Sequence, residues 1–216
     1  MSRRPPLPPP PPPVQLRAWP SHEAMLADRA AVLSDLGGRS LGAAALVVFW
    51  LLVAGVQLGW GVVGVALTVS ADGLAPFGVL IRAALGAVGL GAMVAPVIFL
   101  GLSVQRHRTT RSLMEQWAAL ASHRAGDARF RMAGASLAWL LTSFAAGAAG
   151  LWLALVVPAA ARAGEDTYGG VTYAMGAGTL LWIAGLIGAA RAVGHYRWAI
   201  RLVAPTRRDG AGAGAR

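Results

Sequence analysis

The chain has 216 residues, of which 56% are hydrophobic and 13% are charged, whereas globular domains carry about 25% charged residues. This deficit indicates a membrane protein and leaves too few polar segments for a separate water-soluble domain with its own core. The net charge of +10 would suggest nucleic acid if the protein were soluble, but membrane topology explains it better, so we expect no nucleic-acid partner.

Four stretches of the sequence carry no charge, and each is longer than the roughly 20 residues that cross a bilayer. They cover residues 40–71, 83–105, 132–161 and 167–190. In lipid the backbone must satisfy its own polar groups, so each stretch should be a helix. We therefore predict an all-α integral membrane four-helix bundle, with two short amphipathic cytoplasmic helices and a disordered Pro-rich N-terminal tail.

The N-terminal tail, residues 1–20, contains the tract PPLPPPPPP at positions 5–13. Proline lacks an amide donor and has a fixed φ, which favours a solvated polyproline II conformation. The tract is either a stiff spacer or a ligand for an aromatic groove of a cytoplasmic protein. The first amphipathic cytoplasmic helix is predicted over 21–38, where Ser21 can cap its first turn and Gly37–Gly38 can end it.

The first transmembrane hairpin is predicted over residues 41–103, with helices near 41–69 and 76–103. A basic cytoplasmic loop, 104–132, follows and contains the second amphipathic helix near 109–124. The apolar stripe of this helix consists of Leu113, Trp117 and Leu120. The stripe either rests on anionic headgroups or packs on the inner end of the bundle, and the sequence favours neither. The candidate lipid-facing basic residues beside it are Arg108, Arg111 and Arg124.

The second transmembrane hairpin is predicted over 133–195, with helices near 133–160 and 170–194, before a basic cytoplasmic tail over 196–216. The N-terminal segment, the central loop and the C-terminal tail hold five, six and five arginines, whereas the two opposite loops hold only Arg162. The positive-inside rule therefore predicts that both termini lie in the cytoplasm. All nineteen basic residues are arginine, as in GC-rich genomes, so we expect a bacterial plasma membrane.

Small residues spaced four apart should bring the helices into close contact, because close packing drives helix association in lipid. The candidate packing residues on three of the helices are Gly55 and Gly59, Ala87 and Gly91, and Ala184 and Gly188. These faces serve packing within the bundle or, alternatively, the seam of a homodimer, so a homo-oligomer remains open.

Arg82 is the charged residue that attracts most interest, since a charge inside a span is costly and often functional. Its side chain can snorkel to the outer interface. There Asp72, Glu165 and Asp166 can form an outer salt bridge with it. The alternative is a contact to a substrate or anion at the outer mouth. Arg191, in contrast, is expected to anchor the last helix at the cytoplasmic interface.

The sequence contains no catalytic motif that we recognise. His22-Glu23 begins an HExxH pattern, but Leu26 stands where its second histidine residue would be needed. Walker A and nucleophile-elbow motifs are missing, and without cysteine there is no thiol chemistry. We therefore expect no enzyme, no cofactor and no metal. The predicted function is a small membrane anchor or scaffold that presents a basic cytoplasmic face to anionic lipid or to a protein partner. The alternative is a subunit of a transporter or channel that acts as an oligomer.

Overall fold

The computed structural model describes residues 7–69, 77–121, 133–162 and 167–203, and every regular element in these ranges is helical. After a 3-10 turn at Val14–Leu16, the helices are α1 (His22–Leu41), α2 (Ala43–Thr68), α3 (Gly78–Ala118), α5 (Ala133–Leu151) with a π-helical continuation (Trp152–Val156), α6 (Val157–Ala159) and α7 (Tyr168–Val203). The described residues contain four helices that are long and apolar enough to cross a membrane. The all-α class with four such helices is therefore confirmed.

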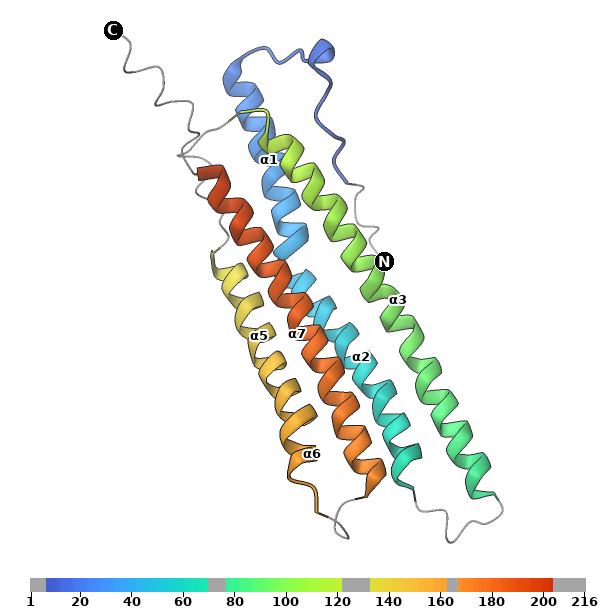
Figure 1. Cartoon of the computed structure of the whole chain (residues 1–216). Helices are drawn as coiled ribbons and strands as arrows, with labels where there is room; N and C mark the ends of the chain where they lie inside the picture. Colours follow the sequence, from blue (N-terminus) through green and yellow to red (C-terminus); the bar gives the residue numbers. More distant parts are fainter. Residues whose placement is uncertain (1–6, 70–76, 122–132, 163–166, 204–216) are drawn as a thin grey trace.

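The four long helices run side by side (Figure 1). α2 packs against α3 on one side and against α7 on the other, and α7 packs against α5. The order of packed neighbours is thus α3, α2, α7, α5, which leaves α3 and α5 with the fewest partners. α1 lies at one end of the bundle and is separated from α2 by Gly42. The Gly42 N–H donates to the Gly38 carbonyl at 2.9 Å, and a Cβ here would collide with that oxygen.

The helix α3 does not end near residue 103, as the sequence predicted, but continues without a break to Ala118. Its 41 residues span roughly 60 Å at 1.5 Å per residue, about twice the hydrocarbon thickness of a bilayer. The physical reason lies in the segment where we expected a break. It contains neither glycine nor proline, and the Thr109 and Thr110 hydroxyls donate to the Gln105 and Arg106 carbonyls of the same helix. The predicted loop over 104–132 therefore begins as helix.

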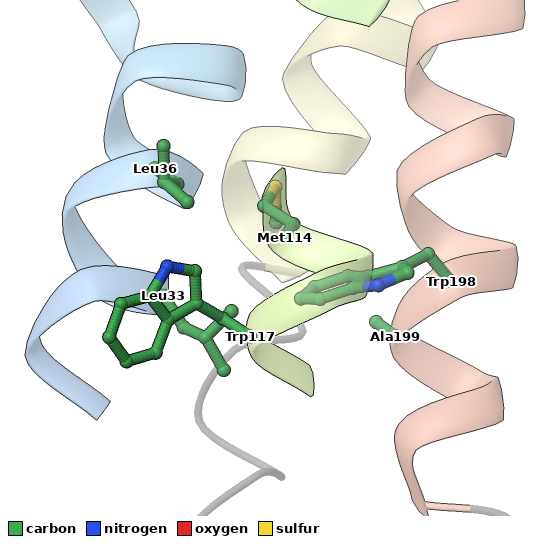
Figure 2. Close-up of a cluster of buried hydrophobic side chains, with 6 residues drawn as sticks. All are labelled: Leu33, Leu36, Met114, Trp117, Trp198 and Ala199. Carbon is green, nitrogen blue, oxygen red and sulfur yellow. The ribbon is translucent and has the colours of Figure 1, made fainter. Parts of the chain in front are cut away.

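α1 and the parts of α3 and α7 that extend beyond their apolar stretches pack on one another. Figure 2 shows the buried side chains at their meeting point. This cluster consists of Leu33, Leu36, Met114, Trp117, Trp198 and Ala199. Leu113 and Leu120 pack against it, so the apolar stripe of the predicted second amphipathic helix is covered by protein. Of the two interpretations that the sequence left open, packing on the end of the bundle is the one observed. We call α1, residues 106–118 and residues 195–203 together the cap.

The described part of the Pro-rich tail, residues 7–20, contacts the cap, and the disorder expected for this tail stays a prediction. Trp117 Nε1 donates to the Pro9 carbonyl at 3.1 Å, and Arg17 Nε donates to the Pro12 carbonyl at 3.2 Å. Trp19 packs against the cap cluster. Proline carbonyls in this tail have no intrahelical partner, so they accept bonds from these donors. Of these two bonds, only that from Trp117 joins the tail to the cap. Residues 1–6 lie outside the described range.

Close contacts between glycines hold neighbouring helices together within the apolar region. A Cβ built on Gly59 of α2 would lie 3.0 Å from the Gly89 carbonyl oxygen of α3, and one built on Gly89 would lie 2.8 Å from the Gly59 oxygen. α5 and α7 approach equally closely at Gly150 and Gly178, where the built Cβ of each lies within 2.7 Å of the other's carbonyl oxygen. Such contacts permit backbone approach and favour association in lipid.

The predicted packing residues divide into two groups. On α2, Gly59 meets α3 as described, and a Cβ built on Gly55 would lie 3.4 Å from the Pro96 Cβ of α3. On α7, Ala184 is buried and Gly188 lies against Ser143 and Phe49.

The two α3 candidates do not pack within the bundle. Ala87 is exposed, and nothing lies within 4 Å of a Cβ built on Gly91. α3 turns Gly89 toward α2 instead. Two positions along a helix correspond to about 200° around its axis, so Gly91 faces away from the bundle.

Candidate functional site

Arg82 lies near one end of the bundle, where it caps a neighbouring helix. Its Nε donates to the Val69 carbonyl at 2.9 Å, and Nη2 donates to the same oxygen. Val69 is the C-cap residue of α2, so the guanidinium lies at the negative end of that helix dipole. This contact satisfies a carbonyl that has no intrahelical partner. The predicted partners Asp72, Glu165 and Asp166 lie outside the described residues.

Hydrogen bonds also join the helices in the apolar region. Gln57 Nε2 of α2 donates to the Ala177 carbonyl of α7 at 3.0 Å, and Trp60 Nε1 donates to the Tyr173 carbonyl at 3.0 Å. Trp139 Nε1 of α5, which is fully buried, donates to the Leu41 carbonyl at 3.2 Å. These bonds fix the rotation of the helices about their axes, because each donor must face its acceptor.

The basic residues predicted to face lipid lie in different surroundings. Arg108 is exposed on the surface of the cap. Arg111 is half-buried, and its Nε donates to Glu115 Oε1 at 3.3 Å. A Cβ built on Gly194 of α7 would lie 2.7 Å from Arg111 Nη1, so the guanidinium reaches across to the neighbouring helix. Arg124 lies outside the described residues.

Arg191 is buried, although the sequence predicted an interfacial anchor. It is only 7% exposed, and its Nη2 donates to Ser103 Oγ of α3 at 3.1 Å. Its guanidinium lies over the Phe49 ring at 5.2 Å and over the Trp139 ring at 5.6 Å. These cation–π contacts favour a cation that has been removed from water. Within the described part of the chain, no carboxylate forms an ion pair with Arg191.

Histidine and arginine side chains converge one helical turn beyond Arg191. His195 of α7 is buried, and its ring lies 5.4 Å from that of Trp198. A narrow cavity of about 10 Å³ lies between α1, α3 and α7, and its polar wall is formed by Ser40, His107, Arg111 and His195. This volume is about that needed for a single water-sized group. Met114 and Trp198 complete the lining.

A wider cleft adjoins this cavity and shares His195, Met114 and Trp198 with it. Its volume is about 740 Å³, and its other wall is α1, mostly with alanine and glycine. The sequence analysis did not single out this arrangement. One signal was present, since His107 and Arg111 are four residues apart, as are Arg191 and His195. That spacing places each pair on one helix face, but only the tertiary structure turns the two faces toward each other.

The comparisons with known proteins assign no family, because no family model, no curated protein and no solved structure matches this chain.

Proposed function

We propose that the chain is a non-enzymatic membrane anchor or scaffold that presents a basic cytoplasmic face to anionic lipid or to a protein partner. The observation that carries this proposal is the cap, in which α1 packs against the parts of α3 and α7 that continue beyond their apolar stretches. Its exposed arginines are Arg106, Arg108, Arg197 and Arg201. These arginines lie in residues 106–118 of α3 and 195–203 of α7. The only described carboxylate in those two ranges is that of Glu115.

A rigid basic surface suits contact with anionic headgroups. The arginines lie within or just beyond the ends of apolar helices, where the surface potential of an anionic leaflet acts most strongly. The proposal therefore includes a bacterial plasma membrane with both termini in the cytoplasm. The chain lacks cysteine, so single cysteines placed at Ser34 and at Thr167 can test this orientation. A membrane-impermeant thiol reagent applied to intact cells should label only the cysteine at 167.

Tryptophan quenching in reconstituted bilayers tests whether the cap binds anionic lipid. Brominated phosphatidylglycerol should quench the tryptophans more strongly than brominated phosphatidylcholine, and added salt should reduce the difference because it screens exposed charges. Replacing the four cap arginines by glutamine should lower the preference several-fold. The matched control is Arg162→Gln, which removes an exposed arginine from the opposite end of the bundle. An unchanged preference in the fourfold variant would contradict the proposal for lipid.

For a protein partner, the proposed contact is the Pro-rich tail, which would bind a cytoplasmic protein. A protein that co-purifies with the full chain should be lost when residues 1–20 are deleted and retained when the cap arginines are replaced. The polyproline backbone is preorganised for such binding, since little conformational entropy is lost. Retention of the partner after deletion would assign the contact to another surface.

A second candidate function is an oligomeric subunit of a transporter or channel. The observation that favours it is the face of α3 that contains Ala87 and Gly91, which is exposed in the single chain. Small residues on an unpartnered helix face allow a second helix to approach closely. Sedimentation in detergent followed by flux measurements in vesicles tests this function. A monomer without flux would exclude it.

A further inference from the structure

We propose that the base of the cap contains a binding site for a phosphate-type oxyanion, formed by His107 and Arg111 of α3 and His195 of α7. This goes beyond the function proposed above, because that function uses exposed arginines, whereas these side chains line an internal cavity. The anion is a phosphate group, supplied either as free phosphate or as the headgroup of an anionic phospholipid.

The three side chains come from two helices and line one cavity, which α1 closes with Ser40. Arg111 reaches this position because Gly194 leaves room for its Nη1. The Ser40 hydroxyl donates to the Gly37 carbonyl at 3.0 Å, so the Arg111 guanidinium is the charged donor that the cavity lining offers to an incoming group. Guanidinium donors form a planar fork that fits phosphate oxygens.

The charges near the cavity favour an anion. Glu115 contacts Arg111 only at Nε, at 3.3 Å, and its side chain is 54% exposed. Arg191 adds a second buried guanidinium one turn deeper, where its hydrogen-bond partner is the neutral Ser103. The Phe49 and Trp139 rings offset part of the cost of burying Arg191, and the Arg111 side chain stays 38% exposed. A bound oxyanion is attracted by both guanidinium groups, whereas a cation would be repelled by them.

The adjoining cleft gives an anion access to the cavity. The cavity holds only one water-sized group, so a single phosphate oxygen enters it while the remainder of the anion lies in the adjoining cleft. The cleft is wide enough, at about 740 Å³, for a phosphate ion or for the glycerol phosphate of a lipid headgroup. Its alanine- and glycine-rich wall on α1 contributes shape without a competing charge.

Binding is measured on the full chain in a neutral detergent. Equilibrium dialysis with radiolabelled inorganic phosphate tests the free anion, and native mass spectrometry with phosphatidylglycerol against phosphatidylcholine tests the lipid. The variants are Arg111→Gln and His195→Gln. The matched control for inorganic phosphate is Arg108→Gln, since it removes the same charge from the same helix at an exposed position. For phosphatidylglycerol the control is Arg162→Gln, because Arg108 belongs to the proposed lipid-facing surface. Tryptophan fluorescence of each variant reports whether the cap is folded.

The proposal predicts saturable binding of one anion per chain. Losing a charge-assisted hydrogen bond costs enough to weaken binding at least about tenfold in Arg111→Gln, and His195→Gln should weaken it too. Arg108→Gln should bind inorganic phosphate, and Arg162→Gln should bind phosphatidylglycerol, as the natural sequence does. Binding of phosphatidylglycerol without binding of free phosphate identifies a lipid site, and binding of both identifies a general phosphate site.

Two results would overturn the proposal. One is the absence of saturable binding by either probe. The other is an equal loss of inorganic phosphate binding in Arg108→Gln and Arg111→Gln, which would indicate diffuse attraction to the basic cap. Failure of this site and failure of the lipid-facing surface remain distinguishable, because dialysis with inorganic phosphate reports on this site, whereas the fourfold glutamine variant in the quenching assay reports on the exposed arginines.

Discussion

The contact between α5 and α7 can be tested by adding one methyl group at Gly150. A Cβ at this position would lie 2.5 Å from the Trp182 amide nitrogen and 2.7 Å from the Gly178 carbonyl oxygen, whereas ordinary contact begins at 3.4 Å. Both neighbours are backbone atoms that cannot rotate away, so Gly150→Ala must push the helices apart by about 1 Å. A gap of about 1 Å forfeits a quarter to a half of the dispersion energy of the contacts along the seam.

Overpacking of this kind typically costs about 1–3 kcal/mol, which is the destabilisation that we expect for Gly150→Ala. Gly147→Ala is the matched control, one turn earlier on the same helix, because nothing lies within 4 Å of a Cβ built there. The control should be neutral or stabilising, since alanine favours helix over glycine by up to about 1 kcal/mol.

The assay is unfolding in mixed micelles by increasing the proportion of a denaturing detergent, followed by tryptophan fluorescence. Gly150→Ala should unfold at a lower proportion than the natural sequence, and Gly147→Ala should not. Coincident unfolding curves for the natural sequence and Gly150→Ala, or an equal loss in both variants, would refute the proposed close approach of the two helices.

Three further changes test individual contacts. Arg82→Leu leaves the Val69 carbonyl without its donor and should lower the unfolding free energy by about 1–3 kcal/mol, measured by the same detergent titration, with no loss if water replaces the guanidinium. Trp117→Phe keeps an aromatic ring but removes the bond to Pro9, so trypsin should release the N-terminal segment faster; an unchanged rate would show that the bond does not hold the tail. Ser143→Ala removes a buried hydroxyl oxygen without a hydrogen-bond partner in the described structure and should stabilise by up to about 1 kcal/mol, whereas destabilisation would reveal a hidden partner.

The sequence analysis located the membrane helices closely. The predicted limits 41–69 and 133–160 compare with Ala43–Thr68 and with the run from Ala133 to Ala159. This success has a local cause, because a charge-free run in lipid has no alternative to helix. The C-terminal ends of α3 and α7 were missed by the prediction, since polar residues beyond an apolar run are compatible with either helix or loop.

Which side of each helix packs against its neighbours was harder to predict from the sequence. In a water-soluble helix the apolar stripe marks the buried side, but in lipid both the buried and the exposed sides are apolar. Gly59 and Gly91 therefore have equivalent sequence signals, and only one of them meets another helix. For the same reason the burial of Arg191 was not predicted, because its position in the sequence is compatible both with the headgroup region and with a place beside two aromatic rings.

The sequence by itself determined that this protein is helical, how many of its helices can cross a membrane, and at which end its arginines gather, because these properties depend on composition within continuous segments. The tertiary structure alone decided that the apolar stripe around Trp117 is covered by α1 and α7, that Gly89 rather than Gly91 meets α2, and that His107, Arg111 and His195 share one cavity. These outcomes depend on how each helix is rotated against its neighbours, and that rotation is set by steric contacts between residues far apart in the chain.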